Sequence, residues 1–246
     1  MQLIQKRHED IFRSRTARSR AAVAGALLMA LSWASSVEAQ SSKNVVYAVT
    51  YFDLAPQSIA HGAHILKDFG NKSRDEKGNV EFAVLQETSR PDRFVVFEGW
   101  RDNSDFEAHS KAEATTKFLA AIKSDAIAPP LQMAPFRSYA TKPVRGTPGR
   151  DSIYMVEHMD FWPPFTSEAE PLVKSLAEGA QKANETLRYD AYQWRGHHYT
   201  IVGIWQNAKA FEASEAAGFT REFRKGSEVP GGRIDLYDER LYKPVE

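Results

Sequence analysis

Two stretches of 25 residues in this chain resemble each other, and this repeat restricts what the chain can fold into. The first copy, FVVFEGWRDNSDFEAHSKAEATTKF, covers residues 94–118, and YTIVGIWQNAKAFEASEAAGFTREF, residues 199–223, aligns with it without a gap. Trp100 falls on Trp205 in this alignment. Each copy reads as a strand followed by a helix, so we interpret the chain as an internal duplication of one supersecondary unit.

The segments around each copy follow the same predicted order of elements. Alternating β-branched and aromatic residues predict the strands, and apolar residues three and four apart predict the helices. The order strand, helix, strand, strand, helix, strand is typical of a ferredoxin-like α+β unit, with both helices on one face of an antiparallel sheet. The predicted strands are 45–52, 80–87, 94–100 and 131–139 in the first half and 152–160, 187–194, 198–205 and 233–241 in the second.

The helix starts are predicted from capping signals. Pro56 opens the first helix, and Ser104 with Glu107 makes a capping box for the second. In the second half Pro171 suits a first helical turn and Asn207 is a good N-cap. Each unit leaves one sheet face uncovered, so the two halves can bury these faces on each other.

Residues 1–39 have the features of a secretory signal peptide. Six basic residues precede an apolar run of 13 residues, 21–33, and Val37-Glu38-Ala39 makes a cleavage site before Gln40. An uncleaved membrane anchor is the alternative, but a spanning helix needs roughly 20 apolar residues. We therefore expect an exported protein, periplasmic or secreted, with no stable membrane insertion after the signal is removed.

The remainder of the chain divides at a predicted linker. Residues 141–151, TKPVRGTPGRD, are rich in proline, glycine and charge and hold almost nothing apolar. The predicted domains are therefore 40–140 and 152–246, the second being a degenerate copy of the first.

Charge and cysteine content exclude several classes of function. The leader takes six of the 32 basic and three of the 32 acidic side chains, which leaves a net charge of about −3 on residues 40–246. No basic patch remains for nucleic acid. The chain has no cysteine, which excludes disulfides, thiol nucleophiles and thiolate metal sites.

Glu98, Trp100 and His109 form a recognisable pattern in the first copy. Glu98-x-Trp100, followed by His109 nine residues later at a strand-to-helix junction, resembles the antibiotic biosynthesis monooxygenase domain family, and within it the small quinol monooxygenases. The resemblance covers nearly all of residues 44–140 and the second half more faintly. It implies that two βαββαβ units pair sheet against sheet into an intramolecular dimeric α+β barrel, although units could also pair between two chains as a homodimer.

The resemblance also implies an activity. Family members oxidise hydroquinones and phenols without a cofactor: the substrate supplies the electrons, and the protein removes a proton in a dry pocket and lets the anion meet O2. His109 is then the candidate catalytic base, because histidine titrates closest to neutral pH, and Glu98 orients it. The candidate substrate-binding walls are Phe94, Trp100 and Phe118. We expect a small aromatic substrate and no cofactor.

A structural interpretation of the same residues is equally concrete. A glutamate paired with a histidine across a strand–helix junction satisfies two polar groups and fixes the helix. In the second copy Glu98 aligns with Gly203 and His109 aligns with Ser214. Because the second unit is expected to fold without the pair, the comparison favours a function for it in the first half.

Two further functions stay open. The same barrel could hold a small apolar ligand without catalysis, as a binding or stress-response protein, and family precedent permits haem handling. Haem-degrading members carry a histidine further along the second helix, whereas this chain has Ala120 twenty residues after Trp100.

Other histidine and aromatic clusters are weaker candidates. His61 and His64 lie three apart on a predicted helix without a carboxylate at metal-binding spacing, so no metal is expected. The FWPPF segment, 161–165, either covers a pocket mouth or packs on the neighbouring unit. A surface turn is expected at His197 and His198. The aromatic residues expected in the core of a nearby strand are Tyr189, Tyr192 and Trp194.

Overall fold

The structure, a computed structural model, describes residues 45–184, 186–227 and 233–245. The predicted signal peptide at 1–39 lies outside the described residues. The compact unit Val45–Glu246 holds all the elements considered below. Within the described residues, no helix combines the length and the apolar content that crossing a bilayer requires.

Each half has the predicted order of elements, with its second helix divided in two. The first half consists of β1 (Val46–Asp53), η1 (Pro56–Ser58), α2 (Ile59–Arg74), β2 (Asn79–Glu87), β3 (Arg93–Trp100), α3 (Asn103–Ser110), α4 (Glu113–Ile122) and β4 (Leu131–Ala140). The second half consists of β5 (Ile153–Phe161), η2 (Pro163–Phe165), α5 (Thr166–Lys182), β6 (Thr186–Gln193), β7 (His198–Trp205), α6 (Ala208–Glu215), α7 (Gly218–Ser227) and β8 (Ile234–Pro244).

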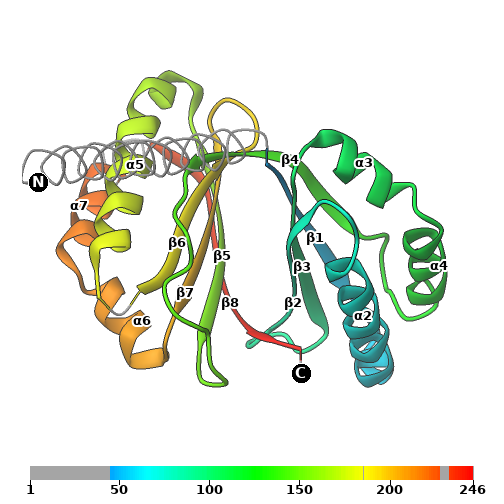
Figure 1. Cartoon of the computed structure of the whole chain (residues 1–246). Helices are drawn as coiled ribbons and strands as arrows, with labels where there is room; N and C mark the ends of the chain where they lie inside the picture. Colours follow the sequence, from blue (N-terminus) through cyan, green and yellow to red (C-terminus); the bar gives the residue numbers. More distant parts are fainter. Residues whose placement is uncertain (1–44, 185, 228–232, 246) are drawn as a thin grey trace, which may run out of the picture. The chain divides into compact units, whose positions relative to one another are not determined.

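The strands form one closed antiparallel barrel in the order β1-β3-β2-β8-β5-β7-β6-β4. The last strand of each half joins the other half, because β4 pairs with both β1 and β6, and β8 pairs with both β5 and β2. Figure 1 shows the helices of each half on the outer face of its own strands. The predicted fold class, two ferredoxin-like units in an intramolecular α+β barrel, is confirmed.

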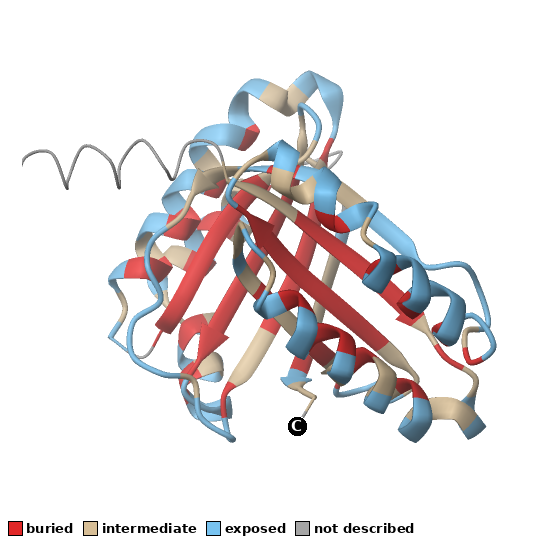
Figure 2. Ribbon diagram, turned by 45° about the vertical axis from the view of Figure 1, so that its right-hand side comes forward, coloured by how far each residue is buried: buried red, intermediate tan, exposed pale blue. Residues whose placement is uncertain are grey.

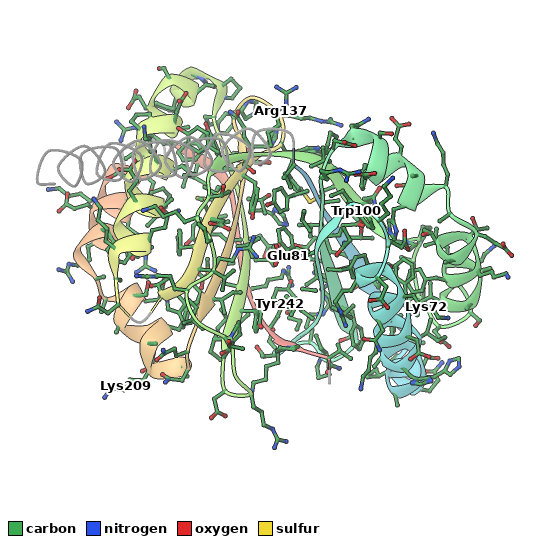
Figure 3. All side chains as sticks on the ribbon, in the orientation of Figure 1. Lys72, Glu81, Trp100, Arg137, Lys209 and Tyr242 are labelled. Carbon is green, nitrogen blue, oxygen red and sulfur yellow. The ribbon has the colours of Figure 1, made fainter. Side chains whose placement is uncertain are left out.

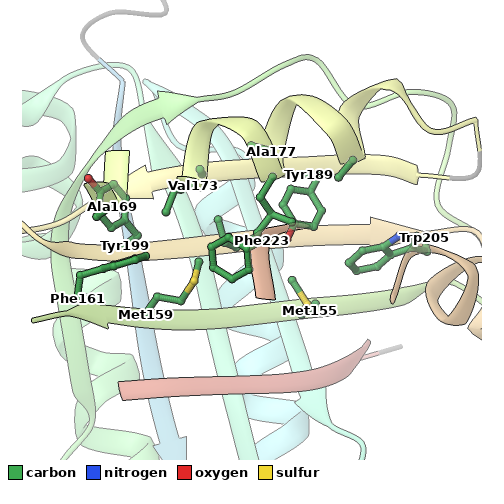
Figure 4. Close-up of a cluster of buried hydrophobic side chains, with 14 of the residues drawn as sticks. Met155, Met159, Phe161, Ala169, Val173, Ala177, Tyr189, Tyr199, Trp205 and Phe223 are labelled. Atoms are coloured by element: carbon green, nitrogen blue, oxygen red, sulfur yellow. The ribbon is translucent and has the colours of Figure 1, made fainter. Parts of the chain in front are cut away.

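Strand alternation divides the apolar side chains among three cores. One core lies between the first sheet and its helices, and a second lies between the second sheet and its helices (Figure 4). The third lies between the two sheets and joins side chains such as Val95 and Val202. Both faces of the central strands are therefore buried, and exposed residues gather on the helices (Figure 2).

The capping box predicted at Ser104 is wrong. The N-cap is Asp102, whose side chain accepts a hydrogen bond from the backbone N–H of Asp105 at 2.9 Å, so the helix starts at Asn103, two residues earlier than predicted. The predicted helix also breaks after Ser110. There the hydroxyl of Thr115 donates to the carbonyl oxygen of His109 at 2.7 Å and satisfies an acceptor that a continuing helix would have used.

In the second half, Asn207 is the predicted N-cap and its side chain accepts from the N–H of Ala210 at 3.0 Å. The start predicted at Pro171 is wrong, because α5 begins at Thr166 and contains this proline. A short 3-10 turn, Pro163–Phe165, leads directly into α5 and starts it before the proline is reached.

The predicted linker is held against the second half. Residues 141–152 belong to no helix or strand. The backbone N–H of Arg145 nevertheless donates to the carbonyl oxygen of Leu187 at 2.8 Å, and that of Lys142 donates to the side chain of Asp190 at 2.9 Å. The boundaries predicted at 40–140 and 152–246 stay a prediction.

Candidate functional site

A cavity of about 150 Å³ lies between the sheet and the helices of the first half. Its walls come from β1, β3 and β4 on the sheet side and from α2, α3 and α4 on the other. The alternation of β3 turns Val96 and Glu98 into this space. The lining residues are Thr50, Phe52, Phe69, Val96, Glu98, His109, Ser110, Thr115, Phe118, Leu119 and Gln132.

The structure brings together the three residues that the sequence singled out. Oε2 of Glu98 accepts a hydrogen bond from the indole N–H of Trp100 at 2.8 Å and lies 3.4 Å from Nε2 of His109. The His109 ring stacks on the Trp100 indole with ring centroids 4.3 Å apart. All three side chains are at least 95% buried. Figure 3 labels Trp100 beside α3, the helix that carries His109.

Glu76 completes this arrangement, and sequence reasoning missed it. Its Oε2 lies 3.0 Å from Nδ1 of His109, so the imidazole bridges two carboxylates. Glu76 follows α2 in a turn, 33 residues before His109. No local spacing connects a turn residue to a helix in a later part of the chain, so the sequence carried no signal for this contact.

Burial controls the charge of Glu98. Loss of solvent raises the pKa of this carboxyl, while His109 and the hydrogen bond from Trp100 oppose the rise. A carboxyl that holds its proton more readily than usual, beside a histidine and facing a cavity, can exchange a proton with a bound molecule. Such a perturbed group in a cavity is typical of a functional site.

Of the three aromatic residues predicted to form the walls of the cavity, only Phe118 does so. Phe118 lines the cavity and stacks on Phe69 with centroids 3.9 Å apart, and the same two rings line an outer groove between α2 and α4. The two rings therefore separate the cavity from the groove. Trp100 and Phe94 are fully buried and do not line the cavity. They occupy supporting positions, Trp100 behind His109 and Phe94 in the core, in place of the predicted wall positions.

The second half has a different arrangement at the equivalent position. A Cβ atom on Gly203 would lie 2.4 Å from Cη2 of Trp205, so this indole occupies the space where a larger side chain at 203 would go. Among the described residues the indole N–H of Trp205 has no hydrogen-bond partner, and Ser214 stands in place of the histidine. The second unit thus folds without the Glu–His pair, as the repeat alignment predicted.

The weaker candidates have ordinary surroundings. Nδ1 of His61 lies 2.6 Å from Asp125, and Nε2 of His64 lies 3.4 Å from Asp68. In the FWPPF segment, Phe161 is fully buried in the core of the second half, whereas the Trp162 side chain is exposed. Tyr189 and Tyr192 are buried as predicted.

Comparisons with known proteins give a family and a fold. Residues 45–121 match the family model for antibiotic biosynthesis monooxygenases. A search of curated proteins gives no significant match. A Fusobacterium nucleatum protein assigned as a monooxygenase superposes with a TM-score of 0.74 at 14% identity, over 82% of this chain and 93% of its own.

Two further solved structures superpose over a similar length. A Lactobacillus acidophilus protein assigned as a monooxygenase gives a TM-score of 0.68 at 8% identity, over 82% of this chain and 95% of its own. An anthrone oxidase-like protein gives 0.60 at 12% identity, over 83% of this chain and 92% of its own. At these identities the likeness concerns the fold. The family match rests on the first half, where residues 45–121 match the model of the antibiotic biosynthesis monooxygenase domain.

Proposed function

We propose that this protein is a cofactor-independent monooxygenase that oxidises a small hydroquinone-like aromatic with O2. The observation that carries the proposal is the buried Glu98–His109 pair on the wall of a cavity of about 150 Å³. A cavity of this volume in another protein holds benzene, so a single hydroxylated ring is the substrate size that fits. A porphyrin is too large for it, which argues against haem handling.

The chemistry starts with the removal of a proton from a ring hydroxyl by the Glu98–His109 pair. The negative charge of the resulting phenolate is delocalised onto a ring carbon ortho to the oxygen, and this carbon forms a bond with O2. The peroxide takes up the proton, and loss of water breaks the O–O bond and the C–H bond at that carbon. One oxygen atom stays on the ring as a carbonyl, the other leaves as water, and all the electrons come from the substrate.

The side chains around the cavity suit this step. Phe52, Phe69, Val96 and Phe118 are apolar walls of the cavity. A ring that displaces water from between such walls strengthens the electrostatic interactions of the few polar groups inside. The imidazole of His109 is held on three sides, by Glu76, Glu98 and the Trp100 ring. A base held in one orientation loses little entropy when it meets its substrate.

A non-catalytic role is the second candidate, and one observation favours it. Both ring nitrogens of His109 already face a carboxylate, at 3.0 Å and 3.4 Å. A histidine paired in this way also holds α3 to the sheet without any reaction. Under this alternative the cavity binds a small aromatic ligand and releases it unchanged.

Oxygen uptake with an isotopic label separates the two candidates. The protein is freed of metals, given hydroquinone and methyl-substituted hydroquinones under ¹⁸O2, and compared with Glu98→Gln and Leu119→Trp, which fills the cavity. We expect uptake with one ¹⁸O atom in the product, a rate at least roughly 100-fold lower in Glu98→Gln, and loss of activity in Leu119→Trp. Uptake without label in the product, or equal rates in all three proteins, contradicts the proposal.

We also propose that the protein acts outside the cytoplasm, on imported, secreted or membrane-derived aromatics. The support is the leader sequence at 1–39. The mass of the protein from the cell envelope tests this directly. Cleavage before Gln40 is the expected result, and a full-length cytoplasmic product contradicts export.

A further inference from the structure

A second cavity, of about 260 Å³, lies between the two sheets. Strand β1 separates it from the first cavity by simple alternation. Thr50 and Phe52 point to the helices and line the first cavity, whereas Tyr51 and Asp53 point to the opposite sheet and line the second. We name it the barrel cavity. It lies outside the proposed catalytic site, on the opposite face of the same sheet.

The floor of the barrel cavity is a hydrogen-bonded row of three buried side chains. Nε2 of His158 lies 2.6 Å from the hydroxyl oxygen of Tyr51, and Nδ1 lies 2.9 Å from the hydroxyl oxygen of Thr200. Burial lowers the pKa of His158 to about 4, so the imidazole is neutral at neutral pH. A neutral imidazole has one donor and one acceptor, which leaves each hydroxyl able to form another hydrogen bond.

The two halves contribute to this floor equivalently. Val46 pairs with Trp100 in the first sheet, and Ile153 pairs with Trp205 in the second, so Tyr51 and His158 hold the same position in their units. Their contact joins the units across the barrel.

The charged side chains around the barrel cavity are already paired. Nε of Arg93 lies 2.7 Å from Asp53, Nε of Arg240 lies 2.9 Å from Asp238, and His198 contacts Asp160. An ionic ligand would need a free opposite charge, because burial of an unpaired charge is costly. These pairs therefore favour a neutral ligand.

The remaining wall is apolar and includes Leu131, Met133 and Trp194. The volume is about 260 Å³ against about 150 Å³ in the first cavity, so a second fused ring fits here. We propose that the barrel cavity is a separate binding site for a neutral, hydroxylated aromatic of two fused rings. The rings lie against Trp194 and Met133, and the hydroxyl hydrogen-bonds to Tyr51.

Nuclear magnetic resonance titration tests this site by itself. The probe is 2-naphthol, and the readout is the indole N–H signal of Trp194, assigned with Trp194→Phe. We expect a saturable shift, an affinity roughly 3- to 10-fold lower in Tyr51→Phe, where one hydrogen bond is lost, and a similar loss with naphthalene. We expect 2-naphthoate to bind more weakly than 2-naphthol.

Two exposed leucines give a matched pair of blocking variants. Leu131 lines the barrel cavity and is 62% exposed, and Leu119 lines the first cavity and is 44% exposed. Leu131→Trp should abolish the Trp194 shift, and Leu119→Trp should leave it unchanged. No saturable shift in the unmodified protein, a shift that survives Leu131→Trp, or tighter binding of 2-naphthoate overturns the proposal. None of these outcomes bears on oxygen uptake at the first cavity.

Discussion

Glu157 is a fully buried carboxyl on β5, on the side that faces the helices of the second half. Burial raises its pKa from the usual 4.5 to about 8, and the nearby Glu239 adds to the rise. Between these two pH values the folded protein holds a proton that the unfolded chain has released. The contribution to stability is therefore present below pH 4.5 and is lost as the pH rises through about 8.

The pKa shift of His158 changes stability with pH in the opposite direction. Its pKa is lowered from 6.5 to about 4, so the unfolded chain binds the extra proton and stability rises with pH between these values. The two effects offset each other up to about pH 6.5. Above this pH, of these two effects, the Glu157 effect remains.

We therefore predict that the free energy of unfolding falls by about 2 kcal/mol between pH 6.5 and 8, at 1.36 kcal/mol per pH unit. Glu157→Gln keeps the shape of the protonated acid, so it should remove this fall and should uncover the rise from His158 between pH 4.5 and 6.5. Urea denaturation at several pH values measures both. The same slope above pH 6.5 in both proteins would show that Glu157 is ionised in the folded state.

The contacts of single residues could be predicted only where they are local. The alternation of β3 placed Glu98 and Trp100 on one face, and the helix that follows had to carry His109 back toward them. Glu76 was missed because it lies in a turn of an earlier part of the chain. Glu157 was missed because a glutamate within an alternating strand gives no sign that it is buried.

The two short helices α3 and α6 begin in the same way. Asp102 caps α3 and Asn207 caps α6, each through one side-chain oxygen and the N–H three residues later. Helix α3 carries His109, whereas α6 carries Ser214 at the equivalent position.

This pair of caps gives a prediction with a built-in control. Asp102→Ala and Asn207→Ala should each lower the free energy of unfolding by about 1 kcal/mol in urea denaturation. Only Asp102→Ala should also lower the rate of oxygen uptake, because fraying of α3 displaces His109. Equal rates in the two variants would mean that the position of α3 does not matter for the reaction.

Element types and their order could be predicted from periodicity, whereas the exact ends could not. Asn207 was predicted correctly because no competing cap lies near it. The Ser-x-x-Glu pattern at Ser104 matches a capping box and favours Ser104 as the N-cap. In the structure the side chain of Asp102, two residues earlier, accepts a hydrogen bond from the free N–H of Asp105. At the break after Ser110, the hydroxyl of Thr115 donates to the carbonyl oxygen of His109. The spacing of apolar residues does not predict such a contact.

At the scale of the whole molecule, one buried cation joins the two halves. Arg188 on β6 forms an ion pair with Glu81 on β2 and a second with Asp190, 2.6 Å away, and donates to the hydroxyl of Tyr192. Figure 3 shows Glu81 between the two sheets. The repeat predicted that the two sheets face each other. It could not predict the contact between Arg188 and Glu81, because these two residues lie in different halves.

Removal of the Arg188 side chain should therefore lower the free energy of unfolding strongly. Arg188→Leu leaves the buried Asp190 and the partly buried Glu81 without this partner, and we expect a loss of about 3 to 5 kcal/mol in the free energy of unfolding. Lys117→Leu removes one member of the exposed pair with Glu113 and should cost less than about 1 kcal/mol. Similar losses in the two variants, measured by urea denaturation, would show that Arg188 does not hold the halves together.

The most direct measurement compares the two halves of the same molecule. Oxygen uptake with hydroquinones is measured for the metal-free protein, for His109→Ala, and for Ser214→Ala, the change at the equivalent buried position of the second half, with circular dichroism to confirm folding. We predict that His109→Ala lowers the rate at least roughly 100-fold and that Ser214→Ala keeps the rate of the unmodified protein. Equal uptake in all three proteins, or none in the unmodified protein, would leave Glu98, Trp100 and His109 as a structural contact between strand and helix.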